Sequence, residues 1–163
     1  TTKILNAVEE VNFEQKHVIP RKVVERFGED LTGKTFAIWG LAFKPDTDDM
    51  RQAAAITIIN ELTKRGAKVK AYDPKAEKEA RVCYLKDNKN VEYCDSKYTV
   101  LVDADAMILV TEWKEFRQPD FIEIKKRLKN PVIFDGRNQF DAHSLSDKGF
   151  EYYQIGVSSK LNK

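Results

Sequence analysis

Cysteine and histidine are scarce in this sequence. The chain has two cysteines, Cys83 and Cys94, and two histidines, His17 and His143, which lie far apart along it. These spacings do not match those of known metal sites, so no metal site is expected. A cytosolic protein rarely keeps a structural disulfide. We therefore interpret both cysteines as packing residues and expect no catalytic residue among them.

Long hydrophobic runs and an excess of one charge are also missing. No apolar stretch approaches the roughly 20 residues that span a membrane, and no signal peptide opens the chain, so a cytoplasmic protein without a membrane partner is expected. A net charge of +2, with no long block of like charges, argues against nucleic acid as a main partner. The cluster Lys125-Lys126-Arg127 lies in a helical pattern, which we interpret as a solvated face.

The dinucleotide fingerprint G-x-G-x-x-G is absent too. The corresponding place holds the segment GLAFKPDTDDMR at residues 40–51, directly after the apolar run at 36–39. Only Gly40 occupies a fingerprint position, so a phosphate group in this turn would be bound by side-chain charge and not by bare backbone. Lys44 is the natural candidate for that contact, as a cation on a flexible stem. The alternative is a surface lysine in a turn made by Pro45 and Asp46.

What the sequence does have, from residue 34 onward, is a regular alternation of short apolar segments and helical patterns. This alternation predicts an α/β fold, Rossmann-like, with an open, mostly parallel sheet and helices on both faces. We expect strands at 35–39, 68–72, 91–93, 106–110, 132–135 and 151–154. We expect helices at 51–65, 75–85, 98–102, 121–128 and 142–148. The polar residues 158–163 are expected to form a frayed tail.

An amphipathic helix is predicted ahead of this fold, at residues 3–28. Apolar residues such as Ile4 and Val8 recur there at helical spacing among charged residues. Pro20 costs about 3 kcal/mol inside a helix, so a kink, or two helices that meet near Ile19, is expected. Such a helix must cover something: the sheet, a domain outside this sequence, or a second subunit.

Arg51 is predicted to begin the helix at 51–65, where the helix dipole favours anions and not cations. Three aspartates, Asp46, Asp48 and Asp49, suit that position and are expected to cap the helix. They do not form a strong Mg²⁺ ligand pattern. The sequence leaves two accounts of Arg51 open, a local pair with an aspartate and the recruitment of a phosphate-bearing ligand.

Three further polar side chains follow predicted strands. Asp73 ends the second strand, where an acidic residue often binds ribose hydroxyls in Rossmann folds, although Pro74 after it equally favours a turn. Glu112 follows the fourth strand and Arg137 follows the fifth. Because the carboxyl ends of parallel strands meet at one edge of a sheet, we expect Lys44, Glu112 and Arg137 to converge there.

Four motifs in order cover about residues 30–155: KTFAIWGLAFKPDTDDMR, AYDPKA, ILVTEWKEF with PDF, and VIFDGRN. Together they resemble the C-terminal domain of the UDP-glucose/GDP-mannose dehydrogenase family. The TEWKEF and FKPDTDD forms resemble its UDP-glucose 6-dehydrogenase branch most, and the leading helix resembles the family's central dimer-forming helix. The resemblance divides the chain into a dimerisation helix region at 1–30, a UDP-sugar-binding Rossmann-like domain at 31–157 and the tail at 158–163.

Enzymes of that family use NAD to oxidise a sugar C6 alcohol to a carboxylate, and their N-terminal domain holds NAD and a nucleophilic cysteine. By position, the resemblance implies that Phe43, Lys44 and Arg137 contact the UDP-sugar and that Arg51 reaches the NAD held by the other domain. It also implies a homodimer formed through the leading helix. The family commonly has a glutamate after this arginine, whereas this chain has Gln52.

Neither Cys83 nor Cys94 matches the family's nucleophile. The sequence therefore looks like a C-terminal fragment, which is expected to be inactive toward UDP-glucose by itself. Two alternatives stay open: a stand-alone nucleotide-binding or regulatory α/β module, and a relative that oxidises GDP-mannose or UDP-N-acetylmannosamine.

Overall fold

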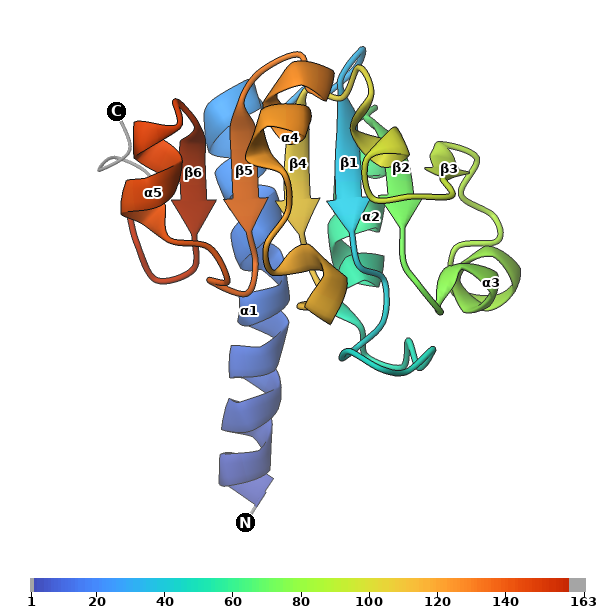
Figure 1. The fold of residues 1–163 in the computed structure, drawn as a ribbon. Helices are drawn as coiled ribbons and strands as arrows, with labels where there is room; N and C mark the ends of the chain where they lie inside the picture. The colour runs from blue at the N-terminus through green and yellow to red at the C-terminus, as the bar shows by residue number, and fades with distance from the viewer. Residues whose placement is uncertain (1, 159–163) are drawn as a thin grey trace.

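The computed structural model describes residues 2–158, which form one six-stranded sheet with helices on both faces (Figure 1). The strands are β1 (Thr35–Trp39), β2 (Lys68–Tyr72), β3 (Val91–Tyr93), β4 (Ala106–Leu109), β5 (Val132–Asp135) and β6 (Glu151–Gln154). Their order is β3-β2-β1-β4-β5-β6, and every neighbouring pair is parallel. The predicted fold class and all six predicted strands are confirmed. The predicted tail lies, except for Ser158, outside the described residues.

The central strands are apolar because both of their faces are covered. All four residues of β4 and of β5 are buried, and so are four of the five in β1. In register, Ile38 of β1 lies between Ala71 of β2 and Ile108 of β4. The strand β2 instead alternates buried and more exposed residues, since it lies nearer the edge of the sheet. The sequence pattern thus follows strand position within the sheet.

The helices α1 (Thr2–Phe27) and α2 (Ala54–Lys64) lie on one face of the sheet, and α4 (Phe121–Arg127) and α5 (Ala142–Asp147) lie on the other (Figure 1). The short helices begin at aspartates whose side chains accept backbone N–H groups, Asp120 for α4 and Asp141 for α5. The helix predicted at 75–85 is divided into α3 (Glu77–Glu79) and a π-helical segment, η1 (Ala80–Tyr84). Two single 3₁₀ turns, η2 (Thr99–Leu101) and η3 (Lys114–Phe116), complete the connections.

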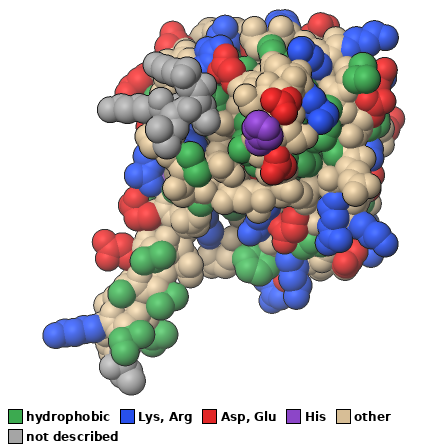
Figure 2. All heavy atoms as spheres, turned by 60° about the vertical axis from the view of Figure 1, so that its left-hand side comes forward, with side chains coloured by type: hydrophobic (Ala, Val, Ile, Leu, Met, Phe, Trp, Pro, Cys, Tyr) green, Lys and Arg blue, Asp and Glu red, His purple; other side chains and the backbone are tan. Residues whose placement is uncertain are grey.

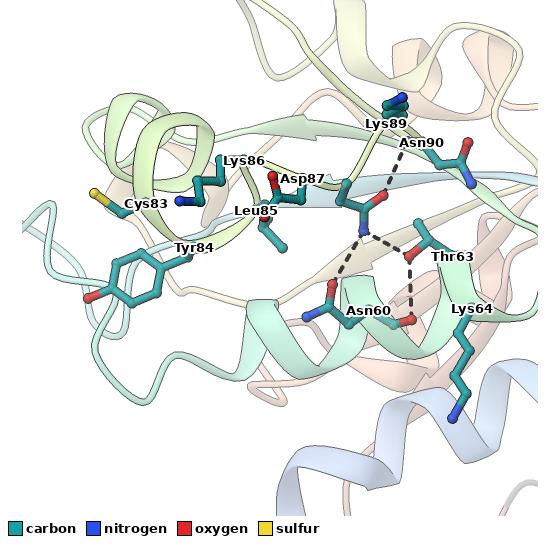
Figure 3. Close-up of a pocket in the computed structure, with 11 residues that line it drawn as sticks. Asn60, Thr63, Lys64, Cys83, Tyr84, Leu85, Lys86, Asp87, Lys89 and Asn90 are labelled. Atoms are coloured by element: carbon teal, nitrogen blue, oxygen red, sulfur yellow. Dashed lines mark hydrogen bonds between the residues drawn. The ribbon is translucent and has the colours of Figure 1, made fainter.

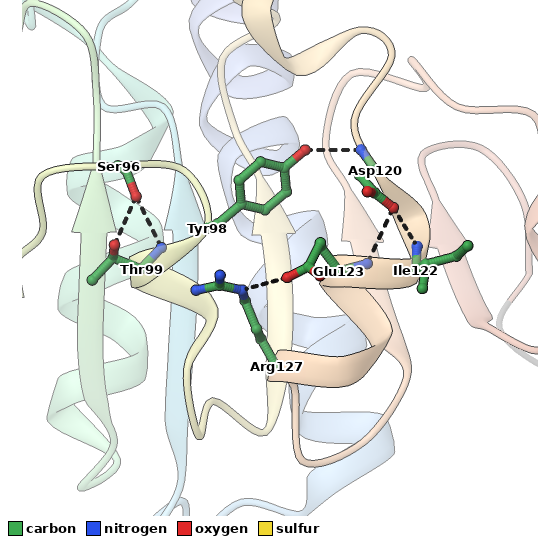
Figure 4. A network of polar contacts seen from close by, with 7 residues as sticks. All are labelled: Ser96, Tyr98, Thr99, Asp120, Ile122, Glu123 and Arg127. Atoms are coloured by element: carbon green, nitrogen blue, oxygen red, sulfur yellow. Dashed lines mark hydrogen bonds and ion pairs between the residues drawn. The ribbon is translucent and has the colours of Figure 1, made fainter.

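The connection from β3 back to β4 is fastened to α4 by a polar network (Figure 4). The Tyr98 hydroxyl accepts a hydrogen bond from the Asp120 N–H at 2.8 Å. Within α4, Arg127 pairs with Glu123 at 3.0 Å, and its guanidinium also lies over the Tyr98 ring. This network runs along α4 from Asp120 to Arg127 and fixes the crossover at which the winding direction of the sheet reverses.

The helix α1 is continuous from Thr2 to Phe27, so the expectation of two helices meeting near Ile19 is wrong. Pro20 removes one helical hydrogen bond, but its ring is buried with Ile19 and Val23, and this burial offsets the loss. No helix among residues 2–158 has both the length and the apolar character needed to cross a membrane.

The two halves of α1 have different surroundings. The second half packs on the sheet, and there Arg26 donates to the Glu151 carboxylate at 2.7 Å, which holds the pKa of Glu151 below its ordinary value. The first half projects beyond the carboxyl ends of the strands (Figure 1). Ile4, Val8 and Val11 of this half are exposed, and hydrophobic side chains are visible along it (Figure 2). The domain therefore covers only half of this helix.

The helix α2 begins at Ala54, three residues later than predicted, so Arg51 does not begin a helix. The Arg51 N–H donates to the Asp49 carboxylate, and Gln52 adopts a left-handed backbone with φ of 62°. These two features turn the chain before helical geometry can start. Since no side chain caps α2, the expected capping by aspartates is also wrong.

Candidate functional site

The strand order creates a crevice at one particular place. From β1 the chain winds toward β2 and β3, whereas from β4 it winds toward β5 and β6. In open α/β sheets, ligands bind at the carboxyl ends of the strands where the winding direction reverses, because the two connecting loops separate there. In this chain the reversal lies between β1 and β4, so the loops that begin at Gly40 and Val110 border the crevice.

The loop after β1 begins with a turn that requires glycine. Gly40 has φ of 98°, and its N–H donates to the Tyr72 carbonyl. A Cβ at this position would lie 2.5 Å from Cβ of Thr111 and 2.6 Å from its backbone nitrogen. Both the backbone angle and the close approach of β4 therefore exclude a side chain here.

Asp73 braces this loop from the end of β2. Its Oδ2 accepts hydrogen bonds from the N–H groups of Leu41 and Ala42 and from the Trp113 indole, at 2.7, 3.0 and 3.1 Å. Its Oδ1 accepts from the backbone of Lys75 and of the following residue, both at 2.8 Å. With both oxygens engaged and the residue buried, Asp73 holds three strand-end loops together. The structure thus confirms the predicted turn-forming role.

The other strand ends hold the same loop. The Thr111 hydroxyl donates to the Ala42 carbonyl at 2.6 Å. Beyond β5, the Arg137 guanidinium donates from Nε to the Val110 carbonyl at 2.9 Å and from Nη2 to the Phe43 carbonyl at 3.3 Å. Glu112 pairs with the same guanidinium at 2.9 Å. The predicted convergence of Glu112 and Arg137 is therefore confirmed.

The turn that carries Arg137 is itself built on a buried carboxylate. Asp135 accepts the backbone N–H groups of Arg137, Gln139 and Phe140, together with the Tyr152 hydroxyl. Burial and the hydrogen bond to Asp135 hold the pKa of Tyr152 well above its ordinary value. The backbone of Arg137 is thus fixed before any ligand arrives.

A groove of about 750 Å³ lies between these loops and the two helices on this face of the sheet. Phe43 and Arg137 line it, and the Phe43 side chain is 47% exposed. Its remaining lining residues are Glu9, Asn12, Phe13, Gln15, Lys16, Ile19, Gln52, Ala54, Thr57, Ile58, Val110, Gly136 and Ile155. Two of the four predicted site residues therefore meet in one concave site.

Lys44 and Arg51 lie on the same loop but outside the groove lining. Lys44 is exposed, and its charge acts on the nearby Asp49 carboxylate, with no hydrogen bond or close ion pair of its own within residues 2–158. Arg51 is 81% exposed and forms a two-pronged pair with the Asp49 carboxylate, which lowers the pKa of Asp49 to about 2. The local-pair account of Arg51 is thus confirmed. No group of acidic, cysteine or histidine residues suited to a metal ion occurs within 2–158.

The wall that α1 gives to the groove was not predicted from the sequence. Phe13 and Lys16 line this wall, and Lys16 Nζ donates to the Gln52 side chain on the facing loop at 3.2 Å. A polar series at helical spacing, Glu9, Asn12 and Lys16, is the signal that could have found it. That series shows a polar face on α1, but not which element the face meets.

A second hollow, of about 540 Å³, lies away from the crevice (Figure 3). Residues from the end of α2 and from the segment before β3 line it, so it opens toward the amino ends of the strands. Asn88 donates to Asn60 and Thr63 across it. These side chains satisfy one another, and we assign the hollow no ligand.

Comparison with known proteins decides the family. Residues 37–142 match the UDP-glucose/GDP-mannose dehydrogenase family, UDP binding domain. The chain belongs to this family. The resemblance inferred from the motifs is therefore confirmed.

Members of this dehydrogenase family are similar in sequence to nearly the whole of this chain. It is 40% identical over 157 residues to UDP-glucose 6-dehydrogenase of Pseudomonas aeruginosa, which is 95% of this chain and 35% of that protein. It is also 40% identical to UDP-glucose 6-dehydrogenase TuaD of Bacillus subtilis, over 94% of this chain and 32% of that protein. The chain thus spans about a third of the length of these relatives.

Solved structures give the same result for the fold. A UDP-glucose dehydrogenase from the archaeon Pyrobaculum islandicum superimposes with a TM-score of 0.74 at 29% identity, covering 91% of this chain and 31% of that one. An NDP-N-acetyl-D-galactosaminuronic acid dehydrogenase from Methanosarcina mazei superimposes with a TM-score of 0.73 at 27% identity, covering 93% of this chain and 31% of that one. The two neighbours differ in the sugar named, so the shared fold does not choose the substrate.

Proposed function

We propose that this chain is the nucleotide-sugar-binding part of an NAD-dependent UDP-glucose 6-dehydrogenase and that its groove holds the UDP end of the substrate. The observation that carries the proposal is the meeting of Phe43 and the backbone-anchored Arg137 in a groove at the point where the sheet changes winding direction. In other open α/β sheets this is the place where nucleotides bind.

The chemistry of the groove suits a nucleoside diphosphate. The half-exposed Phe43 ring gives an apolar face for the flat base or the sugar. Arg137 gives a planar fork that matches two phosphate oxygens, and its Nη1 has no partner among residues 2–158. Lys44, on the same loop as Phe43, adds an exposed cation, and we assign it to the diphosphate.

The remaining parts of the reaction are assigned outside this chain. NAD and a nucleophilic cysteine come from another domain of the same enzyme, so this chain alone does not oxidise UDP-glucose. Arg51 is 81% exposed even in its pair with Asp49, and we assign it to NAD bound on that domain. The enzyme operates in the cytoplasm, where UDP-sugars and NAD are both present.

Calorimetric titration of the chain with UDP, and in parallel with GDP, tests the proposal. UDP is expected to bind more tightly than GDP, and Lys44→Ala is expected to weaken UDP binding by about 10- to 100-fold, the value of one charged hydrogen bond. Lys89→Ala, a change at another exposed lysine near the opposite edge of the sheet, is the control and should leave UDP affinity unchanged. Unchanged UDP affinity in Lys44→Ala would contradict the role of Lys44. Preference for GDP would instead indicate a GDP-mannose dehydrogenase.

We further propose that the chain forms a homodimer through the projecting half of α1. Ile4, Val8 and Val11 are 70%, 52% and 64% exposed and lie on one face of that helix, where hydrophobic side chains gather (Figure 2). Light scattering is expected to give the mass of a dimer for the wild type and of a monomer for the double variant Val8→Glu/Val11→Glu. Asn6→Glu, on a different face, is the control and should remain dimeric. A wild type that is already monomeric excludes this contact.

A further inference from the structure

We infer that Glu112 is a positioning residue, which holds the Arg137 guanidinium in the orientation that receives the diphosphate. This inference rests on the proposed function of the groove. Glu112 itself is not among the residues that line the groove. Its effect on a ligand must therefore pass through Arg137.

The backbone of Glu112 is fixed on both sides. Thr111 before it donates its hydroxyl to the Ala42 carbonyl, and Trp113 after it donates its indole N–H to Asp73. Of the three consecutive side chains, the two outer ones lock the loop after β1, and only Glu112 is left to face Arg137. The carboxylate is thus presented to the guanidinium from a rigid strand end.

The N–H groups of Arg137 have different acceptors. The Nε–H of Arg137 is directed at the Val110 carbonyl and one Nη2–H at the Phe43 carbonyl. Glu112 Oε2 lies 2.9 Å from Nε and is shielded from solvent, yet it accepts no hydrogen bond. Within residues 2–158 it is therefore held by the charge of Arg137 and not by a hydrogen bond. Moving the guanidinium away would leave this one shielded oxygen without a neighbouring positive charge, so the pair resists rotation of the guanidinium.

This arrangement directs the unused donors of the guanidinium away from Glu112. The Nη1 group has no partner among residues 2–158, and Arg137 lines the groove, so we assign Nη1 to the ligand. A guanidinium held in this plane offers a preformed fork to two phosphate oxygens, whereas a mobile one must be ordered on binding. Repulsion between Glu112 and the phosphate is the opposing effect. It is screened because both side chains are more than a third exposed, and the guanidinium lies between the two anions.

The variant Glu112→Gln removes the charge at nearly constant size. UDP affinity is expected to fall about 5-fold, the effect of releasing part of the side-chain order of one arginine, while the affinity for uridine, which lacks phosphates, stays within about 2-fold. Nitrogen-15 relaxation of the arginine Nε–H groups, measured without ligand, is expected to show Arg137 becoming as mobile as the exposed Arg117.

Glu123→Gln is a closely matched control. The Glu123–Arg127 pair has an N–O distance of 3.0 Å and side-chain exposures of 35% and 36%, against 2.9 Å, 38% and 37% for Glu112 and Arg137, but it lies on α4 (Figure 4). It should change neither UDP affinity nor the Arg137 signal. Equal or tighter UDP binding by Glu112→Gln, or an Arg137 signal that keeps its wild-type rigidity, overturns the inference. A folded wild type that binds no UDP overturns the proposed function instead, and the Arg137 signal then decides alone whether Glu112 holds this side chain.

Discussion

Gly40→Ala is expected to lower the free energy of unfolding by about 2–4 kcal/mol, since it adds a backbone penalty of about 1–2 kcal/mol to a steric overlap of similar size. The backbone penalty comes from φ of 98°, which favours glycine. The overlap comes from the new Cβ, which would lie 2.5–2.6 Å from Thr111 atoms, including the backbone nitrogen. Because β4 cannot withdraw without breaking its pairing to β1, the loop must move. Urea unfolding followed by tryptophan fluorescence measures the loss.

Gly28→Ala is the matched control for this change. Gly28 has φ of 96°, close to that of Gly40, but a Cβ there would meet no atom within 4 Å. Gly28→Ala should therefore lower the free energy of unfolding only by the backbone penalty, about 1–2 kcal/mol. The difference between the two variants isolates the close approach of β4. Equal losses would show that the loop after β1 can move away from Thr111 at no cost.

Asp73→Ala is expected to destabilise the protein by about 4 kcal/mol, because each buried donor left without an acceptor costs about 1–3 kcal/mol. The two amides of Leu41 and Ala42 and the Trp113 indole all lose the same oxygen, and none is close to open solvent. Asp73→Asn keeps one acceptor oxygen and should lose about half as much. Urea unfolding again gives the values, and the fluorescence of Trp113 should report the local change.

Asp120→Ala provides the comparison for Asp73→Ala. Asp120 also accepts two backbone N–H groups, but at the exposed start of α4, where water can replace the carboxylate. Its loss should therefore cost only about 1 kcal/mol, as for an ordinary helix cap. If Asp73→Ala also costs no more than this, Asp73 does not brace the three loops.

The strands could be predicted from the sequence because burial on both faces demands unbroken apolar runs, as in 106–109 and 132–135. The start of α2 could not. It depends on Gln52 taking a left-handed backbone that its residue type does not signal, after Asp49 has drawn in the Arg51 amide. A helix boundary set by one side chain bonding to the backbone two residues on leaves little trace in hydrophobic periodicity.

The candidate site, like the fold, could be predicted from the sequence only in part. Its position and Arg137 followed from the strand ends, whereas Phe43 followed only from the family resemblance; both residues line one groove. The brace at Asp73 was not predictable in full, because three of its five donors come from loops after other strands. The α1 wall was also missed, since the face that a helix turns toward the sheet is chosen by tertiary packing. Local sequence patterns predicted where the site lies, whereas the contacts that build it join residues far apart in the sequence and were not predicted.

The continuity of α1 has a mechanical consequence. One rigid rod is clamped at its second half, forms a wall of the groove through Phe13 and Lys16, and ends in open solvent. Pro20, which removes one hydrogen bond, lies close to where the rod leaves its clamp, so the rod is softest there. Bending at Pro20 would move the residues of α1 that line the groove and so change its width, and whatever holds the exposed end of the helix fixes that width.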